Sequence, residues 1–239
     1  MKLLSICPSR DRPELCKRML ESFDLTKSEG TEILVYVSID DPQIGKYEDL
    51  LNGRLHIFGP RRNLVQVLNY VSCELYPDIE FYQEVNDDHT YRTKDWDKEL
   101  IQAIEVKGKG WGIACGNDLM TNEPWEVARH PSAALVSGNI IRTLGYFVYP
   151  EIEHLYTDTY LRDVAEGIES LFRLEDIVIE HCHFISNKAV KDDNYNQVYS
   201  SESYIYSRKM YQRWVRSQRD IDIQKLNKAR KGGADGLSI

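Results

Sequence analysis

The first third of the chain alternates between short, nearly continuous hydrophobic runs and segments with hydrophobic residues on one helical face. Continuous hydrophobic runs are typical of parallel strands in a sheet that is covered on both faces. Strands that alternate with helices form βαβ units, so this pattern predicts an α/β, Rossmann-like fold with a mostly parallel sheet flanked by helices. The predicted strands are residues 2–7, 33–39, 55–58 and 81–85.

Helix signals lie between these strands. Asp11 can cap a first helix, and Pro13 is tolerated in its first turn because the missing N–H has no intrahelical partner there. Helical spacing places Leu15, Met19, Leu20 and Phe23 on one face of this helix. Asn63 can cap a second helix. Its inner side is predicted to carry Leu64, Val65, Leu68 and Val71.

The second half of the chain continues this pattern. Thr157 or Asp158 can begin a helix that runs towards Gly167. Strand alternation places His181 and His183 on one face of a late strand. The hydrophobic runs predict a helix at residues 96–106 and strands at residues 111–115 and 177–184.

Two long segments carry no clear periodicity. Residues 116–133 contain two prolines and predict a loop over the edge of the sheet, and loops of this length are often functional. Trp125 within this loop is a candidate platform for a sugar ring. Residues 186–203 are polar and predict a second loop, and a helix is predicted from about Glu202 onwards.

Polar and charged residues directly follow three of the predicted strands. Ligands of parallel sheets bind beyond the carboxyl ends of the strands, which the fold brings together. Carboxylates suit Mg²⁺ or Mn²⁺, which leave coordination positions for substrate phosphates. A solvated turn is the alternative for each segment alone, but three such segments at one edge favour a binding site. They are Pro8-Ser9-Arg10, Asp40-Asp41 and Asn86-Asp87-Asp88.

Composition limits the class of protein. Hydrophobic residues make up 42 % of the 239 residues and charged residues 28 %, as in ordinary globular proteins. No hydrophobic run has the length of a membrane span, and the first hydrophobic stretch is too short and too soon interrupted for a signal peptide. Five cysteines without paired spacing suit free thiols in a reducing compartment. These features predict a cytoplasmic protein without a transmembrane segment.

Charge is distributed unevenly along the chain. The formal net charge is -8, yet residues 208–231 contain nine Lys or Arg and two Asp, a balance of +7 that leaves -15 for the remainder. We therefore expect a main domain at residues 1–200 and a basic C-terminal helix and tail at 201–239. Three partners suit such a helix: a nucleic acid, an anionic membrane surface with a lipid-linked acceptor, or a second subunit of a homo-oligomer. A solvated charged helix is the alternative.

The ordered set of motifs resembles the glycosyltransferases of the GT-A fold, family 2 in particular, over roughly residues 1–190. The first loop at residues 8–13 and the acidic pair at 40–41 resemble nucleotide-binding segments. Residues 86–88 resemble the D-x-D metal motif of the family. The other segments that resemble the family are residues 137–147, 156–158 and 180–183.

The resemblance implies a metal-dependent, inverting transfer of a sugar from a nucleotide-sugar donor, UDP-linked, with Mn²⁺ or Mg²⁺ as cofactor. It implies that Asp158 is the catalytic base and that Asp88, His181 and His183 bind the metal. Zinc is disfavoured at the two histidines because no second cysteine lies near Cys182 to complete a site. Residues implied in donor binding are Pro8, Ser9, Arg10, Asp40, Asp41, Asn63, Asn86, Asp87, Gly138, Asn139 and Lys188.

The sequence departs from the family pattern at two positions. Asn86 replaces the first acid of the D-x-D motif, so Asp88 must supply most of the direct metal contact. Thr157 precedes Asp158, where many relatives have a second carboxylate. A non-catalytic nucleotide-sugar-binding protein of the same fold therefore stays open, as does a nucleotidyltransferase, although residues 8–13 lack the glycines of that class. The acceptor can be a glycan, a protein, a lipid carrier or a modified DNA base.

Overall fold

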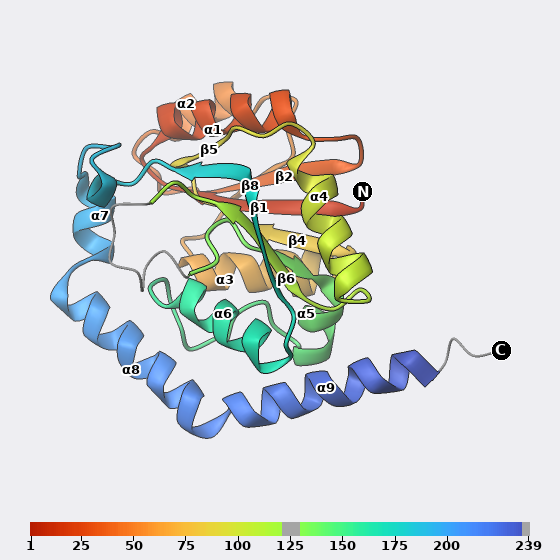
Figure 1. Cartoon of the computed structure of the whole chain (residues 1–239). Helices are drawn as coiled ribbons and strands as arrows, with labels where there is room; N and C mark the ends of the chain where they lie inside the picture. Colours follow the sequence, from red (N-terminus) through yellow and green to blue (C-terminus); the bar gives the residue numbers. More distant parts are fainter. Residues whose placement is uncertain (121–129, 236–239) are drawn as a thin grey trace.

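The computed structural model describes residues 1–120 and 130–235, so Trp125 and half of the predicted loop at 116–133 lie outside the described residues. An eight-stranded mixed sheet forms the centre, with strand order β3-β2-β1-β4-β7-β6-β8-β5 (Figure 1). The strands are β1 (Leu3–Ser9), β2 (Thr31–Ser38), β3 (His56–Gly59), β4 (Phe81–Glu84), β5 (His89–Tyr91), β6 (Ile113–Asn117), β7 (Leu135–Ser137) and β8 (Leu171–His181).

Helices cover both faces of this sheet. The helix α3 (Leu64–Asn69) continues into the π-helical turn η1 (Tyr70–Leu75), and α4 (Trp96–Gln102) continues into η2 (Ala103–Lys107). A short 3₁₀ helix, η4 (Phe184–Ser186), follows β8. The remaining helices are α1 (Pro13–Thr26), α2 (Ile44–Leu51), α5 (Gly138–Leu144), α6 (Thr157–Gly167), α7 (Asp193–Val198), α8 (Ser201–Ser217) and α9 (Arg219–Asp235).

Strand directions explain where polar side chains meet. β1 is parallel to β2 and β4, and β2 is parallel to β3, so the carboxyl ends of these four strands lie at one edge of the sheet. β7 runs antiparallel to both of its neighbours, β4 and β6, and β5 runs antiparallel to β8. The carboxyl end of β7 therefore lies at the edge opposite to that of β4. The mixed α/β class is confirmed, with more antiparallel pairing than the hydrophobic pattern indicates.

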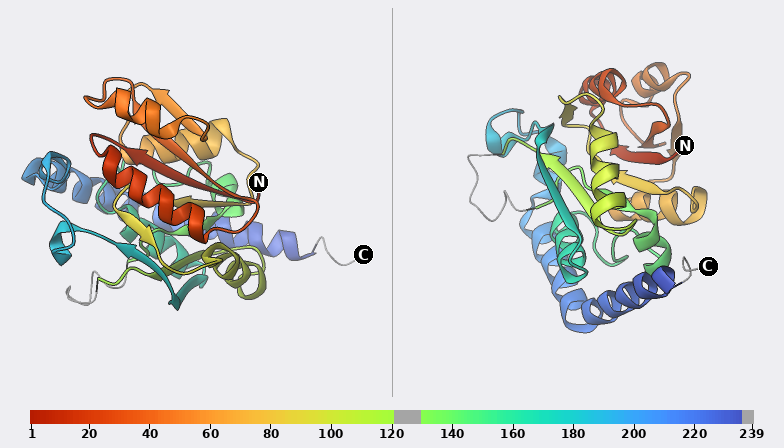
Figure 2. Two further views of the ribbon diagram at one scale, coloured as in Figure 1. Left: turned by 90° about the horizontal axis from the view of Figure 1, so that it is seen from above. Right: turned by 45° about the vertical axis from the view of Figure 1, so that its right-hand side comes forward.

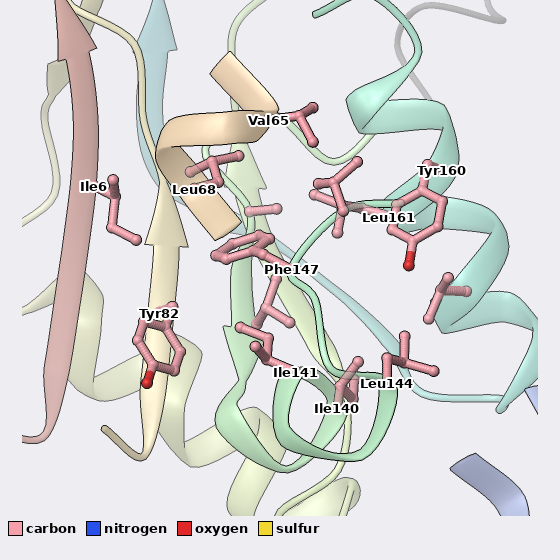
Figure 3. Packing of buried hydrophobic residues seen from close by; sticks show 14 of the residues in the cluster. Ile6, Val65, Leu68, Tyr82, Ile140, Ile141, Leu144, Phe147, Tyr160 and Leu161 are labelled. Carbon is pink, nitrogen blue, oxygen red and sulfur yellow. The ribbon is translucent and has the colours of Figure 1, made fainter. Parts of the chain in front are cut away.

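Two hydrophobic layers hold the sheet between the helices. One layer includes Phe23 of α1, Tyr47 of α2 and Leu100 of α4. The other layer packs α3, α5 and α6 against the opposite face, as the views in Figures 2 and 3 show. Residues labelled in that second layer are Ile6, Val65, Leu68, Tyr82, Ile140, Ile141, Leu144, Phe147, Tyr160 and Leu161.

Local capping agrees with the sequence at one helix and differs at another. Asn63 caps α3 through a capping box, in which its side chain accepts from Gln66 N and Gln66 Oε1 accepts from Asn63 N. Asp11 does not cap α1, because α1 begins after Arg12, which makes no side-chain cap. Asp11 instead adopts a left-handed conformation (φ 55°), and its N–H donates to Asp41 Oδ2.

The C-terminal region forms two helices rather than the single helix that its sequence suggests. α8 and α9 are separated at Gln218 and wrap around the lower part of the sheet domain (Figure 1). Met210, Trp214 and Leu226 are buried in the same hydrophobic layer as α3 and α6, while Ile205 and Ile221 are exposed. None of the helices within residues 1–120 and 130–235 has the length and hydropathy that crossing a membrane requires.

The docking of α8 can be tested through Trp214. Its side chain is fully buried, and Nε1 donates to Asp222 Oδ2 at 2.8 Å. We expect Trp214→Ala to lower the free energy of unfolding by about 3–5 kcal/mol in urea titrations, because it leaves a large cavity. The matched control Ile221→Ala, at a position that is 56 % exposed, should change this energy by under about 0.5 kcal/mol. A small effect of both substitutions would mean that the two helices are not docked in solution.

Candidate active site

A cleft of ≈ 820 Å³ opens at the carboxyl ends of β1, β2 and β4 and is covered on its far side by α7 and the start of α8. The parallel strands bring residues far apart in the sequence to this one edge. The cleft includes nine of the residues predicted for the site: Pro8, Ser9, Arg10, Asn63, Asn86, Asp87, Asp88, His181 and His183.

Asp87 is fixed at the floor of this cleft. Its Oδ2 accepts from Ser9 Oγ at 2.7 Å, and its Oδ1 accepts from Arg12 Nη1 at 3.2 Å. Burial raises the pKa of Asp87 to about 6, against the opposing effect of the Arg12 charge. Asp87 is therefore a positioned carboxylate whose two oxygens are already used by the protein.

Only one of the two carboxylate oxygens of Asp88 accepts a hydrogen bond. Its Oδ2 accepts from the hydroxyl of Tyr195 at 2.6 Å, whereas its buried Oδ1 has no hydrogen-bond partner. His181 Nε2 lies 3.3 Å from this Oδ1. Burial opposes the charged form of Asp88, but His181 outweighs it and keeps the pKa of Asp88 well below its usual range. Asp88 is therefore an anion with an oxygen available to a ligand.

Pairing of β5 with β8 assembles three histidines behind this carboxylate. His89 lies opposite His181 in the antiparallel register, and their rings stack at 4.5 Å between centroids. His89 Nδ1 accepts from Asn86 N, its Nε2 lies 2.9 Å from Ser132 Oγ, and burial lowers its pKa to about 3. His89 is thus a neutral structural residue that fixes the turn before Asp88.

His183 lies near His181, with ring centroids 5.0 Å apart, as strand alternation predicts. Both of its nitrogens have partners, however. Nδ1 accepts from Ile185 N at 3.3 Å, and Nε2 lies 3.3 Å from the Tyr199 hydroxyl. Of the two predicted histidine ligands, His181 is the one whose ring nitrogen is directed at Asp88.

Asp88 Oδ1 makes no hydrogen bond but lies 3.3 Å from His181 Nε2, and a divalent cation could replace the proton between these two groups. A buried carboxylate oxygen without a partner is costly unless a positive group binds it. A carboxylate with a neighbouring imidazole suits Mn²⁺ or Mg²⁺, which keep positions for water and substrate phosphates. Within residues 1–120 and 130–235, no group of three or more His, Cys, Asp or Glu is arranged to hold a metal. A cation at Asp88 therefore depends on water and substrate for most of its ligands.

A contact between Arg12, near the start of the chain, and α7 positions both Asp87 and Asp88. Arg12 donates to both oxygens of Asp192, each at 2.7 Å, and its guanidinium lies 4.1 Å from the ring centroid of Tyr195. Asp192 caps α7, and Tyr195 reaches Asp88 from within that helix. The predicted loop at 186–203 is therefore wrong in part, because α7 lies inside it.

Comparisons with solved structures define the fold. No protein-family model matches the sequence, and no curated protein matches it. The mannosyltransferase PcManGT from Pyrobaculum calidifontis, in complex with GDP-Man and Mn²⁺, superposes with a TM-score of 0.60 over 100 % of this chain and 76 % of that chain, at 10 % identity. The TarS 1-349 structure from S. aureus superposes with a TM-score of 0.56 over 99 % of this chain and 92 % of that chain, at 12 % identity.

The chain has the GT-A fold. A second TarS structure, in complex with UDP-GlcNAc, superposes with a TM-score of 0.55 at 13 % identity and covers 83 % of this chain and 64 % of that chain. Identities of this size establish the fold alone, so the roles of individual residues in this GT-A domain depend on the geometry of its cleft.

Asp158 lies at the first turn of α6, as the sequence predicts, close to the cleft but outside its lining. Its Oδ1 accepts from Thr159 N at 2.7 Å, its Oδ2 lies 3.9 Å from His130 Nδ1, and 48 % of its side chain is exposed. Asp158 and Asp88 both perturb the pKa of Tyr199, which burial raises to about 12. Asp158 and Asp88 therefore both lie near Tyr199, at one end of the cleft.

Glu84 is a second carboxylate near Asp158 that the sequence analysis did not single out. It is buried at the end of β4, and burial, followed by the charge of Asp158, raises its pKa to about 7. A glutamate at the end of a buried strand was the available sequence signal.

Four predicted donor-binding residues lie outside the cleft lining. Asp40 pairs with Arg10 at its edge, at 3.0 Å, and both oxygens of Asp41 accept backbone N–H groups from Asp11 and Gln43. The placement of Gly138 and Asn139 in the donor site is wrong. They follow the antiparallel strand β7, so they lie at the opposite edge of the sheet, where Asn139 Nδ2 donates to Gly110 O.

Lys188 is also absent from the cleft lining. Its Nζ lies 3.0 Å from Glu180 Oε1 and donates to Leu119 O at 3.1 Å. The predicted contact between Lys188 and a diphosphate would require these two interactions to break. This position is explained by β8, which carries Glu180 on the side away from Asp88.

Two arginines that the sequence analysis omitted line the cleft. Arg61 and Arg62 follow β3 at the same edge of the sheet, and Arg62 Nη1 donates to the Tyr36 hydroxyl at 2.9 Å. The Arg62 guanidinium also lies 4.1 Å from the ring centroid of Tyr70. A pair of cations after a strand end was the signal, since a phosphate-binding edge needs positive charge. A smaller hollow of ≈ 510 Å³ on the other side of these arginines contains no aspartate pair.

Proposed function

We propose that this chain is a metal-dependent, inverting glycosyltransferase that transfers a sugar from a nucleoside diphosphate sugar, UDP-linked, to a hydroxyl acceptor. The pair formed by Asp88 Oδ1 and His181 Nε2, 3.3 Å apart in a cleft at the carboxyl ends of parallel strands, carries this proposal. The neighbours of similar fold include proteins solved with GDP-Man and Mn²⁺ and with UDP-GlcNAc.

We assign the donor to the strand-end side of the cleft and the acceptor to the side of Asp158. Ser9, Arg10 and Asn63 lie at its strand-end side and are assigned to the nucleotide, and Arg61 and Arg62 supply positive charge for phosphates. Asp88 and His181 would hold Mn²⁺ or Mg²⁺. When bound, such a cation neutralises charge on the leaving diphosphate.

Asp158 is assigned as the base of a single displacement. The acceptor hydroxyl gives its proton to Asp158 as its oxygen bonds to the anomeric carbon, and the nucleoside diphosphate leaves with the electrons of the broken C–O bond. Because attack occurs opposite the leaving group, the anomeric configuration inverts. The half-exposed position of Asp158 at the mouth of the cleft agrees with proton transfer to and from an incoming acceptor.

Thermal unfolding with nucleotides tests this proposal. UDP, GDP, UDP-GlcNAc and GDP-mannose are each added with MnCl₂ or with EDTA. A nucleotide present at about a hundredfold excess over its dissociation constant stabilises the folded state by about 2.7 kcal/mol, and this raises Tm by roughly 5–10 °C. We expect this rise for a uridine nucleotide with Mn²⁺ and a much smaller one with EDTA. No shift with any nucleotide would contradict the proposal.

Hydrolysis of the bound donor separates an enzyme from a non-catalytic binding protein. We expect slow, Mn²⁺-dependent release of UDP from the nucleotide sugar that gives the largest shift. Binding without any release would favour the non-catalytic alternative, and release of pyrophosphate from a nucleoside triphosphate and a sugar phosphate would favour a nucleotidyltransferase.

A further inference from the structure

One face of α8 is a continuous basic surface. Arg208, Lys209, Arg213 and Arg216 are all exposed and recur at helical spacing on the side opposite to the buried Ser207, Met210 and Trp214. One of these cations is paired, since Arg213 Nη1 lies 3.0 Å from Glu151 Oε2. We call these four residues the α8 basic face.

Exposed large hydrophobic side chains are concentrated in the stretch of sequence that ends in the first turns of α8. Of the twelve exposed large hydrophobic residues within 1–120 and 130–232, six lie between residues 185 and 206. Three of them, Tyr204, Ile205 and Tyr206, are consecutive residues of α8, so this helix exposes hydrophobic as well as basic side chains. The six are Ile185 at 41 %, Val190 at 86 %, Tyr199 at 41 %, Tyr204 at 45 %, Ile205 at 65 % and Tyr206 at 40 % exposed.

The combination of residues on this surface identifies its partner. Ile205 projects from the same side of the helix as the α8 basic face, and Tyr204 and Tyr206 flank it. Met210 and Trp214 on the hydrophobic face of α8 are docked on the sheet domain, but its exposed side combines Lys and Arg with Tyr and Ile, residues that suit the interface of an anionic bilayer. Nucleic acid would use the cations but gives the aliphatic Ile205 and Val190 nothing to bind.

The charge of the whole chain orients such a contact. α8 carries four Arg or Lys and one Glu, a balance of +3, which leaves -11 for the remainder of the chain. An anionic surface attracts α8 and repels the sheet domain, so only one orientation of the molecule is favoured. In this orientation α8 lies on the surface and the sheet domain faces the solvent (Figure 1).

We infer that α8 binds the surface of a membrane that contains anionic lipids. Ser203 and Tyr206 at the start of α8 also line the active-site cleft, so the cleft then opens at the level of the lipid headgroups. On the assumption that the proposed function is correct, the acceptor is a hydroxyl of a lipid or of a lipid-linked glycan. Binding to the membrane itself does not depend on that assumption.

Vesicle co-sedimentation tests the inference with the full chain and without any nucleotide. We expect binding to vesicles of phosphatidylcholine mixed with phosphatidylglycerol at low salt, and much weaker binding to phosphatidylcholine alone or at high salt. The triple variant Arg208→Glu, Lys209→Glu, Arg216→Glu should lower the partition coefficient on the order of 100-fold, since each cation near an anionic bilayer contributes about tenfold or less. Ile205→Ser should lower it by about tenfold or less at unchanged charge.

The control variant carries the same change of charge elsewhere. Lys17→Glu, Lys46→Glu, Lys94→Glu replaces three exposed lysines outside α8 and should bind vesicles much more tightly than the α8 variant. An equal loss of vesicle binding in the α8 variant and in the control variant would show that net charge alone attracts the chain. If the parent chain does not bind anionic vesicles, the inference is overturned. Stronger binding to a DNA duplex, unaffected by Ile205→Ser, would assign the surface to nucleic acid instead.

The proposed function and the inference that α8 binds a membrane can be contradicted independently of each other. UDP binding with Mn²⁺ by the α8 variant is expected to equal that of the parent chain, because the four cations of the α8 basic face lie outside the cleft lining. If the parent chain does not bind a nucleotide, the proposed function is contradicted. The result of the vesicle experiment is not affected by that outcome.

Discussion

Asp88→Asn is expected to remove the dependence of UDP binding on Mn²⁺. The substitution keeps a side-chain oxygen for the Tyr195 hydroxyl, so the fold should be retained. It removes the negative charge beside His181 that the cation requires. We expect the affinity for UDP in MnCl₂, measured by isothermal titration calorimetry, to fall on the order of 100-fold to the value found with EDTA, a loss of about 2.8 kcal/mol.

The matched control for this experiment is Asp49→Asn, which removes one exposed carboxylate from α2. It should leave the affinity for UDP and its dependence on Mn²⁺ unchanged. If the parent chain binds UDP equally well with Mn²⁺ and with EDTA, Asp88 does not hold a cation. A large loss of thermal stability in Asp88→Asn would instead assign Asp88 to the support of α7.

Asp158→Asn is expected to lower the rate of sugar release by a factor on the order of 10²–10⁴, the usual contribution of a positioned base. Affinity for the donor should stay the same, because Asp158 lies outside the lining of the cleft. Asparagine can still accept from Thr159 N, so α6 should begin at the same residue. Steady-state release of UDP from the nucleotide sugar, together with calorimetric binding of UDP, measures both quantities.

Glu166→Gln provides the control on the same helix, since Glu166 is exposed and its substitution removes an equal charge. Glu166→Gln should change neither the rate of sugar release nor the affinity for UDP. If Asp158→Asn loses binding and turnover together, Asp158 is structural. If Asp158→Asn retains turnover, the buried Glu84, whose pKa is raised to about 7, becomes the next candidate, and Glu84→Gln tests it.

The strand ends were the part of the site that the sequence could predict. Ser9, Asp87 and Asp88 each follow a hydrophobic run, and parallel strands necessarily bring their carboxyl ends together. Strand alternation likewise placed His181 and His183 near each other, although β8 ends at the first of them. These predictions needed only local periodicity and one rule of topology.

Other predictions failed because strand direction is not a local property. The segment that contains Gly138 and Asn139 has the composition of a ligand loop, but β7 runs antiparallel and carries it to the wrong edge. The three-residue strands β5 and β7 are too short to show a period of two. Their pairing partners, and therefore their directions, depend on contacts with distant strands.

The helix that covers the cleft, α7, was the least predictable part of the site. α7 is only six residues long and polar on most sides, so neither its periodicity nor its hydrophobicity indicates a helix. Its stability comes from Asp192, which caps it and pairs with Arg12, and from Tyr195, which packs beneath that arginine. Such a helix is specified by tertiary contacts rather than by its own sequence.

The bond between Arg12 and Asp192 joins residues 180 positions apart, and this separation has a consequence for biosynthesis. Strands β1 to β4 leave the ribosome first, and their parallel pairs can form while the rest of the chain is still being translated. The pocket for the cation is incomplete at that stage, because β8 and α7 supply His181 and Tyr195. A nascent chain is therefore expected to contain a folded sheet without donor affinity until α7 has emerged.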